Sequence, residues 1–280
     1  MSKNYVSSIL TDPDGFTQGI EGPACDKDGV LYAVNYARQG TIGSVSPQGI
    51  CDVFVDLPPN SIGNGIRFHS DGDMFIADYT GHNILRVDMG TKTVSVFSHE
   101  PLMNQPNDIA IAKNNTIYAS DPDWSNGSGQ IWKIDTQGNS ECLEKNMGTT
   151  NGIEVSPDET VLYVNESLQR NVWAYDILPD GGIENKRLVI QFPDYNMDGM
   201  RCDIDGNIYI TRHGKGTIAK LSPSGEVLLE IELIGRDPSN LAFGGPDGCT
   251  CYVTIQDCGN IESFRVERPG RSWTLYADNI

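Results

Sequence analysis

The stretch from residue 64 to residue 77 reads Asn64-Gly-Ile-Arg-Phe-His69, then Ser70-Asp-Gly-Asp73, then Met74-Phe-Ile-Ala77. Five other segments repeat this pattern in register, and they begin at Glu21, Asn107, Asn151, Asp198 and Asn240. Successive starts lie 43, 43, 44, 47 and 42 residues apart, and a tyrosine or phenylalanine follows each start by 11 or 12 residues. A period of this length, kept through six copies, is the signature of a repeat fold.

Two more extended segments follow the aromatic residue in each repeat, for example residues 83–87 and 93–97 in the second copy. Glycine, asparagine and aspartate between the segments suit tight hairpin turns. Four antiparallel strands per period predict the blade of a β-propeller, so we expect an all-β fold, a single six-bladed propeller domain of residues 1–280. No segment shows a sustained helical period. The outer strand of the last blade has two candidates, residues 5–10 and residues 272–276, and the pattern does not choose between them.

The composition excludes several classes of function. With 38 acidic against 20 basic residues the net charge is −18, which argues against nucleic acid and anionic membranes as partners. No apolar run approaches the length of a membrane span, and the N-terminus lacks the pattern of a signal peptide, so we expect a cytoplasmic protein. The seven cysteines are scattered without a Cys-x-x-Cys pair, which favours free thiols over disulfides or a zinc site.

The first residue of each repeat marks a candidate site. In a propeller the first strand of every blade lines the central channel, so the six repeat starts should meet at one rim. All six carry a side-chain oxygen: Glu21, Asn64, Asn107, Asn151, Asp198 and Asn240. Asparagine also caps turns and lines water-filled channels, and for Asn64 and Asn240 we favour this structural role. The Glu21 and Asp198 carboxylates would repel each other unless a cation or a proton compensates, and mixed carboxylate and amide oxygens suit a hard divalent cation.

The second strand of each blade returns to the same mouth and should deliver further side chains there. The residues that end these strands, and three that follow them, are Asn35, Asp78, Asp121, Glu166 and Arg212, with Tyr36, Trp124 and His213 just beyond. A cation surrounded by such groups suits a polyhydroxylated small molecule. His213 could transfer protons at neutral pH, although a rim histidine without a role is the favoured interpretation.

The same residues carry a family resemblance over nearly the whole chain. The motifs are Glu21-Gly-Pro23, Gln105-Pro-Asn-Asp108, Asn151-Gly-Ile153 with Ser156-Pro-Asp-Glu159, Asp198-Gly-Met200 and Pro238-Ser-Asn-Leu-Ala-Phe-Gly-Gly245. Together they resemble the SMP-30/gluconolactonase/LRE family of six-bladed propellers, and most of all its bacterial gluconolactonase branch. The resemblance implies that Glu21, Asn151 and Asp198 hold one divalent cation, with Asn107 beside it, close enough to count among the ligands or to contact substrate or a bound water. Metals of the family include calcium, which we expect here, and also zinc, magnesium, manganese and iron.

The resulting hypothesis is a metal-dependent hydrolase that opens the ring of a sugar lactone, an aldono-γ- or δ-lactone. Asp198 would be the catalytic base for the attacking water. The expected substrate contacts are Asn107, Gln105, Asp121, Arg212 and His213, and at position 105 some relatives carry arginine. Two alternatives stay open: an organophosphate triesterase on the same metal site, and a non-catalytic propeller that binds a ligand.

Overall fold

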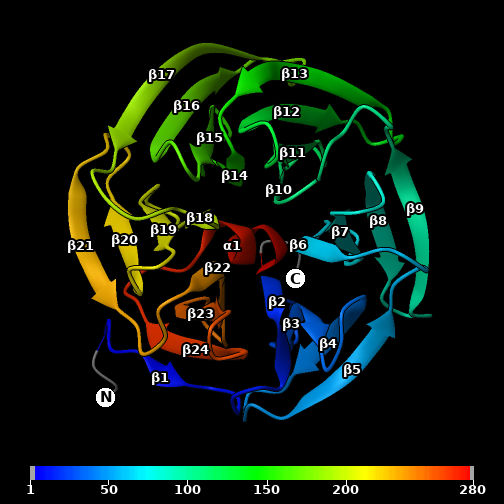
Figure 1. The fold of residues 1–280 in the computed structure, drawn as a ribbon, viewed down its shortest axis with the longest axis vertical. Helices are drawn as coiled ribbons and strands as arrows, with labels where there is room; N and C mark the ends of the chain where they lie inside the picture. Colours follow the sequence, from blue (N-terminus) through cyan, green and yellow to red (C-terminus); the bar gives the residue numbers. More distant parts are fainter. Residues whose placement is uncertain (1–3, 278–280) are drawn as a thin grey trace.

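The structure is a ring of six four-stranded antiparallel sheets, as Figure 1 shows for the computed structural model, which describes residues 4–277. The six-bladed β-propeller predicted from the repeat is confirmed. In five of the sheets the four strands follow one another along the chain from the channel outward. Each inner strand contains a repeat start or begins two residues after one, so the sequence repeat and the blade coincide.

The first three blades run from residue 16 to residue 147. Blade 1 contains β2 (Phe16–Cys25), β3 (Leu31–Tyr36), β4 (Thr41–Val45) and β5 (Cys51–Asp56). Blade 2 contains β6 (Gly63–Phe68), β7 (Met74–Asp78), β8 (Asn83–Asp88) and β9 (Thr93–His99). Blade 3 contains β10 (Ile109–Ile111), β11 (Ile117–Asp123), β12 (Ser128–Ile134) and β13 (Ser140–Met147).

The other three blades follow, and the last one includes a strand from the other end of the chain. Blade 4 contains β14 (Thr150–Val155), β15 (Val161–Glu166), β16 (Asn171–Ile177) and β17 (Ile183–Gln191). Blade 5 contains β18 (Met200–Cys202), β19 (Ile208–Arg212), β20 (Thr217–Leu221) and β21 (Val227–Glu232). Blade 6 contains β22 (Pro238–Gly244), β23 (Thr250–Ile255), β24 (Asn260–Arg265) and β1 (Ser8–Ile9). The helix α1 (Arg271–Ala277) comes last.

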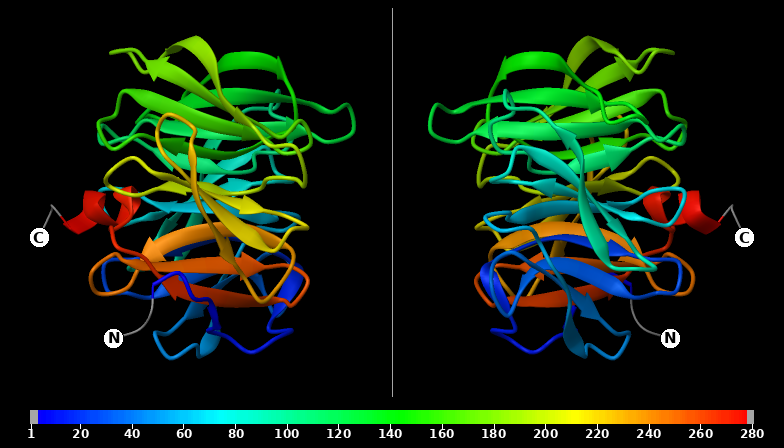
Figure 2. Two further views of the ribbon diagram at one scale, coloured as in Figure 1. Left: turned by 90° about the vertical axis from the view of Figure 1, so that its left-hand side faces the viewer. Right: turned by 90° about the vertical axis from the view of Figure 1, so that its right-hand side faces the viewer.

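The two chain ends have different roles in the ring. β1 pairs antiparallel with β24, with Ser8 opposite Ser263, so the N-terminal segment supplies the outer strand of the last blade. Residues 272–276, the other candidate for that strand, lie in α1. Figure 1 shows α1 on the axis of the ring, and Figure 2 shows it on one face of the molecule. Because α1 is only seven residues long, no helical period reveals it in the sequence.

The hydrophobic core lies between neighbouring sheets. Val34 of blade 1 and Ile66 of blade 2 belong to one buried cluster that fills the space between these blades. The repeated aromatic residue packs in such spaces: the ring of Tyr32 lies 5.7 Å from that of Phe68 in the next blade. An aromatic side chain buries a large apolar area against the adjacent sheet, which explains why every repeat keeps one at this position.

Irregular pairing near the start of each inner strand turns one side chain into the channel. The register of β2 with β3 shifts just after Glu21, and that of β14 with β15 shifts across Asn151. Similar shifts occur in β6 and β22. In blades 3 and 5 the pairing begins only at Ile109 and Met200, shortly after the repeat start. A bulge or a strand end interrupts the ladder at or beside the repeat-start residue, so its side chain can be redirected.

All seven cysteines are free thiols, and four of them are buried. Within residues 4–277, no helix has both the length and the apolar character that crossing a membrane requires. The predicted domain of residues 1–280 includes positions 1–3 and 278–280, which are outside the described residues.

Candidate functional site

A cavity of about 370 Å³ opens at one end of the central channel. The starts of the inner strands and the turns that follow the second strands line it. The helix α1 lies at the other end, because its Arg271 pairs with Glu159 in the turn beyond the far end of β14. The cavity and α1 are therefore on opposite faces of the ring.

Five of the six repeat-start residues line this cavity together. They are Glu21, Asn64, Asn107, Asn151 and Asp198. The Asp198 carboxylate lies within hydrogen-bonding distance of the side chains of both Asn151 and Glu21, so blades 1, 4 and 5 meet at one point. The sixth repeat start, Asn240, lies behind Glu21 and donates from Nδ2 to Glu21 Oε2 over 2.9 Å.

The glycine after a repeat start lets neighbouring blades approach closely. A Cβ atom on Gly152 would lie 2.6 Å from the carbonyl oxygen of Asp198, which is the next repeat start. The Gly152 N–H donates to that same oxygen over 3.0 Å, and Asn165 Nδ2 donates to it over 2.7 Å. A side chain at Gly199 would likewise collide with Asn240. These contacts fix the backbone of Asp198 against blade 4 and so set the separation of the candidate ligands.

Glu21 and Asp198 bring two carboxylates into one poorly hydrated place. Burial, and after it the charge of Asp108, raises the pKa of Glu21 above its ordinary value. Burial, and after it the charge of Glu21, raises the pKa of Asp198 well above its ordinary value. A second negative charge in such a place is unfavourable, so the pair favours a bound proton or a bound cation.

Several oxygens around these carboxylates have no hydrogen-bond partner within residues 4–277. They are Glu21 Oε1, Asn64 Oδ1, Asn107 Oδ1 and Asn151 Oδ1, all buried and all on residues that line the cavity. Buried acceptors normally have partners, so four that share one space point to a positive species between them. Carboxylate and amide oxygens are the ligands of hard divalent cations, and these residues fit such an ion. In the described part of the chain no three His, Cys, Asp or Glu side chains form a metal cluster, so amide oxygens would have to complete the ligand set.

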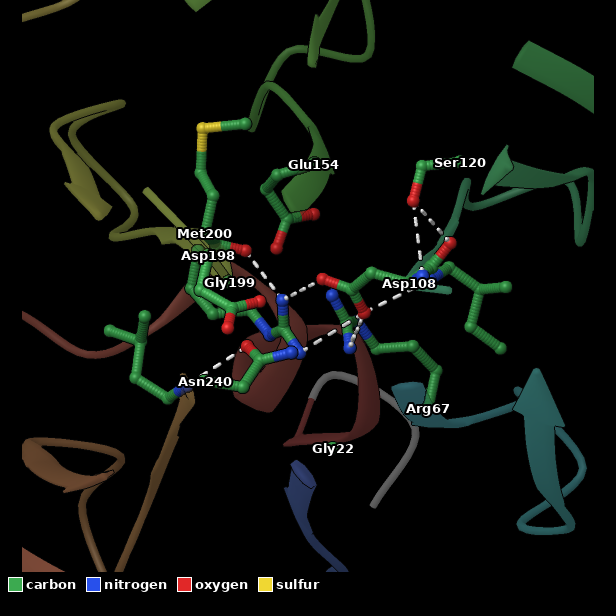
Figure 3. A network of polar contacts seen from close by, with 12 residues as sticks. Gly22, Arg67, Asp108, Ser120, Glu154, Asp198, Gly199, Met200 and Asn240 are labelled. Carbon is green, nitrogen blue, oxygen red and sulfur yellow. Dashed lines mark hydrogen bonds and ion pairs between the residues drawn. The ribbon is translucent and has the colours of Figure 1, made fainter. Parts of the chain in front are cut away.

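An ion-pair network lies behind the lining residues, outside the cavity itself, and we refer to it as the floor; Figure 3 shows Asp108 within it. The fully buried Asp108 carboxylate accepts from Arg201 Nη1 over 2.8 Å and from Arg67 Nη1 over 3.2 Å. Burial alone would raise the pKa of Asp108, but the charges of Arg201 and Arg67 outweigh it and hold this pKa below its ordinary value. Arg201 also lowers the pKa of Glu21. Asp108 nevertheless raises the pKa of Glu21 more than Arg201 lowers it, and it also raises the pKa of Asp198, so the network does not relieve the repulsion between the two carboxylates.

The acidic residues near the ends of the second strands hold loops and do not face the cavity. Asp121, expected to contact substrate, instead accepts hydrogen bonds from the backbone N–H groups of Asn104 and Gln105 over 2.8 and 2.6 Å. Asp78 and Glu166 bind the equivalent backbone segments of their own blades. None of these three acids lines the cavity. Their carboxylates position the segments from which the lining residues extend.

Arg212 and His213 are also outside the cavity lining. Arg212 is 1% exposed, because its guanidinium pairs with Asp194 at 2.8 Å and lies over the ring of Phe192. His213 Nε2 lies 3.2 Å from Oε1 of Gln256, whose side chain does line the cavity. Arg212 therefore supports blade 5, and His213 contacts the wall of the site rather than its interior.

Six lining residues are absent from the set predicted by sequence: Gly19, Gln39, Ile62, Gly63, Tyr79 and Gln256. Tyr79 and Gln256 directly follow second strands, and Trp124, which was expected at the rim, lines the cavity from just beyond another one. The rule that identifies Trp124 would therefore also have found Tyr79 and Gln256. The expected substrate contact Gln105 is hydrogen-bonded to the Tyr79 hydroxyl and reaches the site through it.

Similarities to known proteins identify the family to which this chain belongs. The gluconolactonase of Zymomonas mobilis is 29% identical over 221 residues, which cover 68% of this chain but only 60% of that enzyme, less than two thirds of its length. The diisopropyl-fluorophosphatase of Loligo vulgaris is 26% identical over 95% of both chains. The solved structure of a gluconolactonase from Xanthomonas campestris has the same fold, with a TM-score of 0.79 at 19% identity over 93% of this chain and 89% of that one. Residues 19–257 match the SMP-30/gluconolactonase/LRE-like region, and the chain belongs to this family.

Proposed function

We propose that this protein hydrolyses a sugar lactone, an aldono-γ- or δ-lactone, with the help of one divalent cation. The observation that carries the proposal is the meeting of Glu21, Asn151 and Asp198 in one cavity, with unpaired buried oxygens beside them. The curated relative named gluconolactonase supports a reaction of this class.

Glu21, Asn151 and Asp198 would hold the cation, with Asn107 beside it. All of these residues offer oxygen atoms, and neither histidine nor cysteine is among the described residues that line the cavity. Oxygen-only sites suit calcium, magnesium or manganese better than zinc, so we expect calcium.

Ring opening needs a polarised carbonyl, an activated water and a proton for the leaving oxygen. A bound divalent cation supplies Lewis acidity to the lactone carbonyl. Asp198 would accept the proton of the attacking water and return it to the ring oxygen as the C–O bond breaks. The Asn107 amide would donate a hydrogen bond to a substrate oxygen, and the aromatic rings of Tyr79 and Trp124 would contact the apolar faces of the sugar.

Substitution of Asp198 tests this proposal directly. We expect Asp198→Ala to lower kcat/KM on every lactone by about 1,000-fold or more, because both a cation ligand and the base are lost. Turnover is followed with a pH indicator on a panel of lactones, after chelation and re-addition of single divalent metals, with the uncatalysed rate subtracted. Asp28→Ala, at an exposed turn on the opposite face, is the matched control and should keep full activity. Undiminished turnover by Asp198→Ala, or by wild-type protein stripped of divalent ions, would contradict the mechanism.

The fluorophosphatase relative makes an organophosphate triesterase the second candidate. A cation that polarises a carbonyl also polarises a phosphoryl oxygen, so both reactions suit the same ligands. Parallel assays on an aldonolactone and on a fluorophosphate compare the two values of kcat/KM, and we expect the lactone to have the higher one. A non-catalytic propeller would hold no metal tightly. Elemental analysis of the dialysed protein distinguishes the two cases, because a metal that remains bound argues against the non-catalytic alternative.

A further inference from the structure

The cavity wall above the two carboxylates consists of uncharged side chains. Amides come from blades 1, 2 and 6, at Asn35, Gln39, Asn64 and Gln256, and aromatic rings come from Tyr79 and Trp124. Among the lining residues of the described chain there is no lysine, arginine or histidine. The wall can therefore offer hydrogen bonds and apolar faces to a ligand, but no positive charge.

Three buried arginines near the site have partners outside the cavity. Arg212 is buried against Asp194 and Glu230, at 2.8 and 3.4 Å. Arg67 and Arg201 are buried beside Asp108 in the floor and are not among the lining residues. Inside the cavity, a substituent therefore meets no cationic side chain of the described residues; the exposed Arg38 and Arg236 lie on loops outside the lining.

Two glutamines form the part of this wall that can contact substrate hydroxyl groups. Gln256 has a fixed backbone, because its N–H donates to Asp237 over 2.9 Å and its carbonyl accepts from Gly259 over 3.3 Å. Its Oε1 contacts His213, so one end of the amide is held and the other is left for the cavity. In the neighbouring blade 1, the Asn35 side chain already donates to the carbonyl of Gly19 and accepts from the N–H of Gly40, so Gln39 is the second glutamine that can contact a substrate.

We propose that this site selects lactones whose other substituents are hydroxyl groups and rejects lactones that carry a phosphate, sulfonate or carboxylate. The inference rests on the proposed lactonase function and deepens it. An anionic substituent enclosed by the lining residues would lose hydration without gaining a cationic partner there, which is strongly unfavourable. The charges of Glu21 and Asp198 would neutralise a divalent cation that they hold, and the net charge of −18 repels anions at longer range.

The test compares D-glucono-δ-lactone with its 6-phosphate, which differ only in the charge at the far end of the molecule. We expect kcat/KM to be at least about 100-fold higher for the neutral lactone. Calorimetric binding of 1,5-anhydro-D-glucitol and its 6-phosphate gives the same comparison without turnover, because neither ring can be opened. An equal or higher kcat/KM for the phosphorylated lactone overturns the inference and leaves the lactonase proposal intact. Absence of turnover with both lactones overturns the lactonase proposal, and this inference with it.

A variant that adds a positive charge tests whether the cavity wall causes the preference for uncharged lactones. Gln256→Arg should raise kcat/KM on the phosphorylated lactone by about tenfold and reduce the preference for the neutral one, because the new guanidinium pairs with phosphate. Gln48→Arg adds the same charge to an exposed turn on the opposite face and should leave the preference unchanged. An equal shift in both variants would assign the selectivity to net charge and would overturn the role of the wall. Thermal unfolding of both variants verifies that they fold.

Discussion

Asp108 is completely buried, and the guanidinium groups of Arg67 and Arg201 are its charge partners. Both arginines are buried too, so removal of the carboxylate would leave two positive charges with little hydration. Breaking a buried ion pair from one side is costly for this reason, whereas an exposed pair contributes little. The floor of the cavity is therefore a stability element as well as an electrostatic one.

We expect Asp108→Asn to lower the free energy of unfolding by about 3–5 kcal/mol, because its amide cannot neutralise the two arginines. Chemical denaturation measures the loss. Asp71→Asn removes one partner of the exposed Asp71–Arg86 pair and should cost less than about 1 kcal/mol. Equal losses in the two variants would show that the floor contributes no more than a surface ion pair.

At the residue scale, the sequence identified the repeat-start residues that line the cavity. It did not predict what the residues at the ends of the second strands do. Glu21, Asn151 and Asp198 recur at one register of a visible repeat, and strand geometry brings that register to one rim. Asp121 and Arg212 also recur at one register, yet backbone N–H groups or other charges take up their side chains. A repeat shows where a side chain begins, but competition among nearby partners decides where it points.

At the scale of elements, α1 joins blades that are distant along the chain. Arg271, at its start, donates to Glu154 Oε1 over 3.2 Å and to the carbonyl of Ile111 over 3.1 Å, and it also pairs with Glu159. These partners belong to blades 3 and 4, whereas the chain reaches α1 from blade 6. The helix therefore links opposite parts of the ring across the end of the channel.

Arg271→Ala should lower the free energy of unfolding by about 3–5 kcal/mol, since it leaves the buried Glu154 carboxylate without its cation. Thermal or chemical unfolding measures this loss. Arg268→Ala, which breaks the exposed pair with Asp205 just before the helix, serves as the control and should leave stability nearly unchanged. If cation affinity fell in Arg271→Ala protein that is still folded, α1 would have a role in the site that its position on the opposite face does not explain.

The blades were predictable from the sequence, but these two terminal elements were only partly so. Six copies of a pattern reinforce one another, whereas β1 has two residues and α1 has seven, too few for a periodic signal. Residues 272–276 contain tryptophan, threonine and tyrosine, which favour strands locally. In the structure these residues are helical, and the ion pairs of Arg271 with Glu154 and Glu159 hold the start of the helix at the end of the channel.

At the scale of the whole molecule, the candidate ligands connect blades 1, 4 and 5 across the ring. A ring of blades is stabilised by contacts between neighbours, while a cation bound at its centre would connect blades that are not all adjacent. Binding to the folded state alone raises the free energy of unfolding, by about 2.7 kcal/mol when the free cation is at 100 times its Kd. For a chain of this length that corresponds to a rise in Tm of roughly 5 °C.

Glu21→Gln should therefore have opposite effects on the metal-free and the metal-loaded protein. Without metal, burial and the negative charges of Asp198 and Asp108 disfavour the Glu21 carboxylate, so the neutral amide should leave Tm unchanged or raise it at pH 7. With calcium present, the loss of a charged ligand should abolish the metal-dependent rise that the wild type shows. Thermal unfolding with chelator and with calcium measures both effects, and Gln39→Ala, which alters a lining residue outside the proposed ligand set, should keep the rise. A calcium-dependent rise that survives in Glu21→Gln would place the cation elsewhere in the protein, and a large loss of Tm in the metal-free variant would mean that Glu21 stabilises the fold without any cation.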